Sequence, residues 1–256
     1  QGAFLTRGLL MSHFRTVLRH SSYLLGFKLL SRALAVIFLV YAAARLGPEL
    51  FGALSFVLVT VELLAGIGDL GITRYGAREL LRDWDGRAVL AGQILSLQAL
   101  TSLLLAAAGL VIVVVYQPAY PKYELLLLGL AAFLTFSVIA TTESIFTASQ
   151  RFFYSALLTF LGRLIYVGIG IAALAAGQSV VVIMWGYVVA VVVEAGARLL
   201  VARKVTPFSF RFPAAALWRM LLATMPFAVV GIASIFSYRV NLMILEFIRG
   251  DAAAGV

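Results

Sequence analysis

The chain has 256 residues, of which 63% are hydrophobic and 12% are charged, and it carries a net charge of +9 and no cysteine. Soluble globular domains are about 45 to 50% apolar and about 25% charged, so this composition excludes a soluble fold and indicates an integral membrane protein. The missing cysteine excludes disulfides and thiolate metal sites, and no cofactor is expected. Lysines and arginines follow the loops instead of gathering in one patch, so no nucleic-acid partner is expected.

Several continuous apolar stretches are each long enough to cross a bilayer as a helix, which takes about 20 residues. Segments this long and uniformly apolar form helices, because the strands of membrane barrels alternate over about 10 residues. The sequence therefore predicts an all-α, polytopic transmembrane helical bundle of about seven spans. The predicted spans are residues 22–43, 50–73, 88–116, 124–147, 153–176, 179–202 and roughly 220–247.

The segment that precedes the first span, residues 1–21, mixes apolar side chains with arginines. This pattern predicts an amphipathic basic helix on the inner membrane surface. A cytoplasmic N-terminus leaves only Arg45, Lys122 and Arg249 on the outer side, and the positive-inside rule therefore favours this orientation. Anionic inner-leaflet lipids are the expected partners of the inner bases. Those bases are Arg7, Arg15, Arg19, Arg74, Arg78, Arg82, Arg87, Arg151, Arg203, Lys204, Arg211 and Arg219.

Ionised side chains inside the first two spans are the first candidates for function, because a buried charge in a membrane is expensive. Lys28 and Arg32 are one helical turn apart and share a face. They could present paired cations to an anionic substrate such as a diphosphate, or bind carboxylates on neighbouring helices. Glu62 and Asp69, seven residues apart, also share a face. Glu62 could balance Lys28 or Arg32, or bind a coupling proton or sodium ion; an ion pair inside the bundle is the structural alternative.

The later spans carry further charges. Glu143 and Arg163 each stand alone in a span, and an interhelical pair between them is one possibility. Glu194 and Arg198 are spaced i, i+4 and are predicted to pair within their helix with a structural role. The spacing patterns of zinc proteases and serine hydrolases are missing, so an enzyme is not expected.

The longest polar break, residues 204–219, is predicted to be a cytoplasmic loop. It separates a six-helix lobe, residues 22–203, from a last segment, residues 220–256. Pro226 is predicted to kink or open the seventh span as a hinge, and a kink without a transport role is the alternative. Arg239 lies deep in the same span. The chain is expected to be part of a longer protein.

A series of landmarks resembles the polysaccharide flippases of the MOP superfamily, the Wzx-type and related lipid-linked oligosaccharide exporters. Their order and spacing cover nearly the whole chain. The landmarks are residues 45–56 (RLGPELFGALSF), Asp69-Leu70-Gly71 followed by Arg78-Glu79-Leu80, Ser149-Gln150-Arg151, and Met225-Pro226 with Arg239. The resemblance implies two pseudo-symmetric lobes around a central cavity, with this chain supplying the first lobe and the first helix of the second.

The resemblance also implies a function: alternating access would carry an undecaprenyl-diphosphate-linked glycan from the inner to the outer leaflet of a prokaryotic cytoplasmic membrane. Cationic cavity residues would meet the diphosphate, and Lys28, Arg32, Arg163 and Arg239 are the candidates by charge and depth. A polysaccharide polymerase or assembly proteins would be further partners.

Two other interpretations stay open. A multidrug or small-solute exporter of the same superfamily would need a less cationic cavity and an essential carboxylate such as Asp69 or Glu62. A seven-helix scaffold would pair all its membrane charges and leave no basic cavity. Counting unpaired cations separates this scaffold from the flippase.

Overall fold

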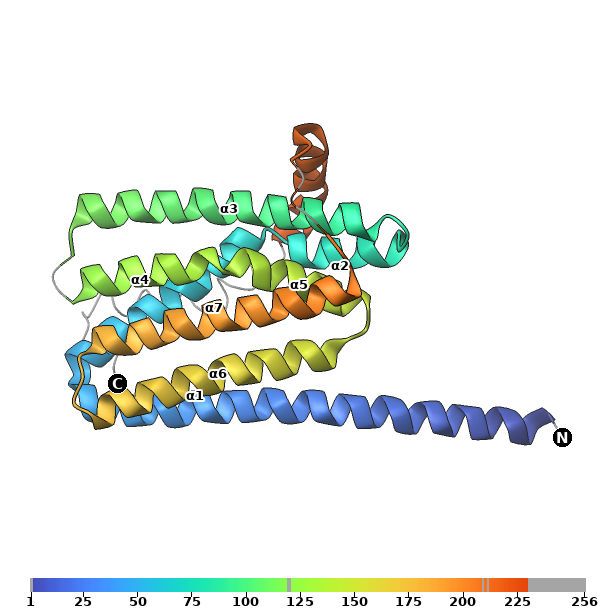
Figure 1. The fold of residues 1–256 in the computed structure, drawn as a ribbon, viewed down its shortest axis with the longest axis horizontal. Coiled ribbons are helices and arrows are strands. Elements are labelled where there is room, and N and C mark those ends of the chain that lie inside the picture. Colours follow the sequence, from blue (N-terminus) through green and yellow to red (C-terminus); the bar gives the residue numbers. More distant parts are fainter. Residues whose placement is uncertain (1, 119–120, 209, 211, 230–256) are drawn as a thin grey trace.

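The computed structural model describes residues 2–118, 121–208, 210 and 212–229, and residues 2–24 are described by their backbone alone. This part of the chain is helical, and the long helices run side by side in a bundle (Figure 1). The predicted all-α transmembrane bundle is therefore confirmed. Arg239 and the rest of residues 230–256 lie outside the described residues. The helices are α1 (Gly2–Asp69), α2 (Ile72–Arg82), α3 (Arg87–Tyr116), α4 (Lys122–Leu134), α5 (Phe136–Ala148), α6 (Phe152–Ala175), α7 (Val180–Val205) and a short apolar helix, Ala214–Val229.

Helix α1 makes two passes because it bends at Gly47. This residue has φ 73° and ψ 171°, a conformation that glycine adopts without steric cost, and Pro48 then starts a new helical segment. The apolar part, Leu25–Asp69, has 45 residues and would be about 68 Å long if straight, against a hydrocarbon core of about 30 Å. Residues 2–46 are called the first arm and residues 48–69 the second arm. They account for the predicted spans 22–43 and 50–73.

Residues 2–24 are helical and continue the first arm without a break, so that α1 extends far beyond the other helices at its N-terminal end (Figure 1). The predicted N-terminal helix is thus present. Its position on the membrane surface stays a prediction.

Four later stretches are also long and apolar enough to span a membrane: Arg87–Tyr116, Lys122–Ala148, Phe152–Ala175 and Val180–Val205. The second of these joins α4 and α5 across a single interruption at Thr135, whose amide and hydroxyl both donate to the Ala132 carbonyl. These four stretches match the predicted spans 88–116, 124–147, 153–176 and 179–202.

Helix α2 is short and amphipathic, unlike its neighbours. Ile72, Gly76, Ala77 and Leu80 are buried on one side of it, while Arg74, Arg78 and Arg82 are exposed on the other. These arginines belong to the set that was predicted to face the cytoplasm. The apolar side of α2 packs with α3, α5 and the helix Ala214–Val229 in one core cluster.

The first arm, α6 and α7 form the largest apolar core cluster, together with the start of the second arm. Phe38 of the first arm lies edge-on against Tyr166 of α6, with ring centroids 4.9 Å apart. A Cβ at Gly170 would collide with the Phe38 ring, so the missing side chain lets the two helices approach.

Helix α7 ends at Val205, and the next helix begins at Ala214. The connection is therefore shorter than the predicted loop 204–219, because the helix starts within it. This helix is unbroken at Pro226 and continues to Val229, where the described residues end. Proline removes one backbone hydrogen bond without ending the helix here, so the hinge role of Pro226 stays a prediction.

Candidate functional site

One group of membrane charges forms a closed network around Arg198 of α7, whose side chain is 3% exposed. Its Nη1 lies 3.0 Å from Glu143 Oε2 on α5, and its Nε lies 2.9 Å from Glu194 Oε1 one turn earlier. Nη2 donates to Thr159 Oγ1 on α6 at 2.6 Å, and the Ser155 hydroxyl donates to Glu143 Oε2 at 2.5 Å. Three helices are thus joined by charge-assisted hydrogen bonds.

The predicted Glu194–Arg198 pair is confirmed, but the pair considered between Glu143 and Arg163 is wrong: Glu143 binds Arg198 instead. Depth explains the difference. Glu143 lies about 8 Å from the C-terminal end of α5 and Arg198 about 10 Å from that of α7, whereas Arg163 lies about 16 Å from the N-terminal end of α6. The signals that sequence reasoning missed were Ser155 and Thr159, two hydroxyls one turn apart at the level of these charges.

Asp69, at the end of α1, has a different environment. Its Oδ1 accepts hydrogen bonds from the Thr73 amide at 3.0 Å, from the Thr73 hydroxyl, and from Gln98 Nε2 on α3 at 2.9 Å. These bonds satisfy the Thr73 amide in the first turn of α2 and link that turn to α3. Asp69 forms no ion pair within the described part of the chain. The geometry gives Asp69 a structural role, and a coupling role for it stays a prediction.

The helix Ala214–Val229 packs on the turn that follows Asp69. Leu70 and Gly71 have φ 43° and 72°, and a Cβ on Gly71 would lie 2.7 Å from the Phe227 carbonyl carbon and 2.9 Å from the Ala228 nitrogen. The Arg78 guanidinium lies 5.9 Å from the centre of the Phe227 ring. The landmark Asp69-Leu70-Gly71 therefore contacts the residues that directly follow the landmark Met225-Pro226, although the two are far apart in sequence.

Tyr75, near this turn, shows how closely α2 is packed. Burial raises the pKa of the Tyr75 phenol above its usual value, and the Glu79 carboxylate adds to the shift. The phenol stays neutral at physiological pH and packs as a partly buried apolar group against the core around α2.

Asp69→Ala is expected to lower the free energy of unfolding by about 1 kcal/mol, because the start of α2 loses its hydrogen-bond acceptor. Asp69→Asn keeps an acceptor oxygen and should remain within about 0.5 kcal/mol of the parent protein. Thermal unfolding of the purified protein in detergent measures both. Equal losses in the two variants would mean that the charge of Asp69, and not its acceptor oxygen, holds the junction.

Three cations at membrane depth are arranged differently from Arg198. Lys28 and Arg32 are exposed on the first arm, on a flank away from Phe38, and Arg163 is half-buried on α6. The first arm and α6 are neighbours, since the Phe27 ring lies 5.5 Å from that of Phe160. Within the described residues, none of the three cations forms an ion pair. Their role as contacts of an anionic substrate stays a prediction.

Tyr187 of α7, which sequence reasoning did not select, lies between α6 and the second arm. Its ring centroid lies 5.3 Å from that of Tyr166 on α6, and it packs against the apolar cluster that contains Val61 of the second arm. Glu62, next to Val61, is exposed on the second arm and takes part in an interaction of its own.

Comparison with known proteins agrees with the resemblance drawn from the landmarks. The model of a family described as Polysaccharide biosynthesis protein matches residues 17–256, nearly the whole chain. No curated protein and no solved structure matches the chain. With its membrane-spanning helices, this match supports a transporter role in polysaccharide biosynthesis. The chain is a multi-pass membrane protein that belongs to the polysaccharide biosynthesis family of MOP-superfamily flippases.

Proposed function

We propose that the protein flips a polyprenyl-diphosphate-linked oligosaccharide from the inner to the outer leaflet of a prokaryotic cytoplasmic membrane. It does so by alternating access of two lobes and without catalysing a reaction. The observation that carries this proposal is the set of three cations, Lys28, Arg32 and Arg163, which have no ion pair among the described residues. Anionic lipids surround the inner bases, and polymerase or assembly proteins act with the flippase.

The physical argument rests on the cost of charge in a membrane. A cation near the bilayer centre costs about 2.5 to 3.5 kcal/mol, and the fold offsets this cost for Arg198 with two carboxylates. Lys28, Arg32 and Arg163 have no such compensation in the described structure, which favours a wet cavity or an anionic ligand. A scaffold with no cargo would have paired them, and an exporter of neutral or cationic solutes would not need them.

Diphosphate chemistry fits this arrangement. Ammonium and guanidinium groups bind phosphate oxygens through short, charge-assisted hydrogen bonds, and several cations match the several negative charges of a diphosphate. Lys28 and Arg32 are one turn apart on one helix, so both can contact the same headgroup. Arg239 is proposed as a fourth contact, and it lies outside the described residues. Glu62 is the proposed coupling carboxylate, because it is an acidic side chain at membrane depth on the second arm.

Transport by the full-length natural protein in proteoliposomes tests the proposal. Lys28→Ala/Arg32→Ala should slow the flipping of a fluorescent polyprenyl-diphosphate glycan about tenfold, because two contacts to the headgroup are lost. Lys28→Arg/Arg32→Lys keeps both charges and should retain most of the rate. Arg163→Ala should also slow transport.

The matched control is Arg203→Ala/Lys204→Ala, which removes two exposed charges at the inner end of α7. It should flip the glycan at the parent rate. Parent-level flipping by Lys28→Ala/Arg32→Ala at equal protein level would remove this pair from the substrate site. Export of small solutes without any glycan flipping would favour the small-solute exporter instead.

A further inference from the structure

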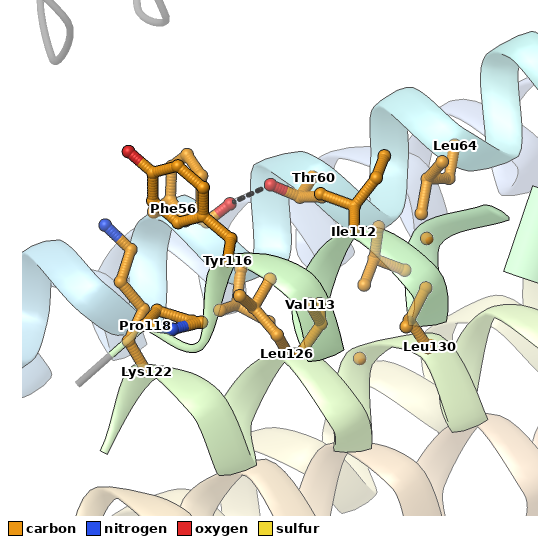
Figure 2. Close-up of a pocket in the computed structure, with 14 residues that line it drawn as sticks. Phe56, Thr60, Leu64, Ile112, Val113, Tyr116, Pro118, Lys122, Leu126 and Leu130 are labelled. Carbon is orange, nitrogen blue, oxygen red and sulfur yellow. Dashed lines mark hydrogen bonds between the residues drawn. The ribbon is translucent and has the colours of Figure 1, made fainter. Parts of the chain in front are cut away.

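An apolar cavity of about 570 Å³ lies between the second arm of α1, α3 and α4 (Figure 2). Its volume falls within the range of about 300 to 1,000 Å³ that is usual for small-molecule sites. The walls are almost entirely hydrocarbon, from Phe56 and Leu64 of the second arm to Ile112 of α3 and Leu130 of α4. It contains none of the three proposed headgroup cations, so it is separate from the proposed transport site.

The cavity has one charged end. Pro118 and Lys122 lie together at this end and Leu64 and Leu130 at the other (Figure 2). The Lys122 ammonium lies 4.2 Å from the centre of the Phe56 ring, which holds the cation at the mouth. Lys122 was predicted to lie on the outer side of the membrane. The cavity therefore has a cation at the outer interface and apolar walls below it.

The polar atoms along the cavity do not compete for a ligand. The Thr60 hydroxyl donates to the Phe56 carbonyl of its own helix at 2.8 Å, so it needs no other partner. Tyr116, at the mouth, is 82% exposed and has the position of an interfacial tyrosine. An occupant must therefore be hydrocarbon along its length and anionic only at the mouth.

The length of the cavity matches part of one leaflet. Lys122 and Leu130 are eight residues apart on one helical stretch, which corresponds to about 12 Å along the helix. One leaflet contributes about 15 Å of hydrocarbon. We propose that the cavity binds one acyl chain of an outer-leaflet glycerophospholipid, with its phosphate beside Lys122.

Charge favours a phospholipid over the polyprenyl diphosphate carrier. A phosphodiester has one negative charge, fewer than a diphosphate has. The exposed Glu124 lies in the first turn of α4, two residues beyond Lys122, and would oppose the additional charges of a diphosphate. The site thus fits an ordinary membrane lipid that fills a gap between helices.

Native mass spectrometry of the purified full-length protein, with phosphatidylglycerol added in detergent, tests this site. Thr60→Phe places a ring in the cavity and Lys122→Gln removes the cation, and each should reduce phospholipid occupancy about tenfold. Thr60→Val keeps the space and should retain the lipid. Arg45→Gln should retain it too, because Arg45 lies 5.5 Å from the Tyr41 ring, a similar cation–ring contact, and does not line the cavity.

Unchanged occupancy in Thr60→Phe would overturn the proposed site. Unchanged occupancy in Lys122→Gln would overturn the phosphate contact. Polyprenyl phosphate is added in a second arm at the same mole fraction, and if it displaces the phospholipid from the parent protein, the assignment to a phospholipid is wrong. This result does not depend on glycan flipping, so a failure of the proposed transport would leave the lipid site standing.

Discussion

Arg198→Met is expected to lower the free energy of unfolding by about 3 kcal/mol, because it leaves two carboxylates without their cation. Glu194 is only 12% exposed, and its charge would remain buried beside Thr159 with no guanidinium. Glu143 is 38% exposed and can be solvated in part, which places the loss at the low end of the range for broken buried pairs. Thermal unfolding of the purified protein in detergent, followed by size-exclusion chromatography, measures this change.

A rescue variant separates loss of charge balance from loss of packing. Glu143→Gln/Glu194→Gln/Arg198→Met carries no charge in the network and should recover most of the stability of the parent protein. Arg203→Met, which removes an exposed arginine five residues further along α7, is the control and should change little. Parent-like stability of Arg198→Met would show that the network does not hold α5, α6 and α7 together.

Gly71→Ala is expected to lower the free energy of unfolding by about 3 kcal/mol and to displace the helix Ala214–Val229 from the turn at Gly71. Two costs add up. A side chain at φ 72° costs about 1 to 2 kcal/mol, and the new Cβ would lie 2.7 Å from a backbone carbon of Phe227, which no rotamer change can relieve. Unfolding temperature and limited proteolysis of the connection at residues 206–213 measure the two effects.

Gly177 provides a matched control for the backbone strain. It has φ 67°, and a Cβ there would meet nothing within 4 Å. Gly177→Ala should therefore cost only the strain and leave proteolysis at residues 206–213 unchanged. If the two alanine variants lose the same stability, the contact between Gly71 and Phe227 contributes nothing.

The architecture could be predicted from the sequence because lipid leaves a continuous apolar segment only one regular option, the helix. The turn between the first two passes was also visible, since Gly47 and Pro48 interrupt an otherwise apolar run. The Glu194–Arg198 pair followed from spacing within one helix. Each of these predictions depends on neighbours in sequence, and this is why the sequence was sufficient.

Partners on different helices could not be predicted in the same way. Whether Glu143 meets Arg198 or Arg163 depends on the depth and rotation of three helices, which hydropathy does not determine. The contact of Gly71 with Phe227 depends in the same way on where the helix Ala214–Val229 docks. The lack of ion pairs at Lys28 and Arg32 in the described residues likewise became visible only when the surrounding helices were placed.

The bend at Gly47 bears on how the chain enters the membrane in the first place. A first arm that inserted alone would carry Lys28 and Arg32 into lipid with no carboxylate on the same pass. Because Gly47 and Pro48 reverse the chain within two residues, both arms can leave the insertion machinery as one hairpin. Glu62 then accompanies the two cations, and the net charge that must be transferred falls from two to one. The hairpin, and not the single helix, is thus the natural unit of insertion for this part of the protein.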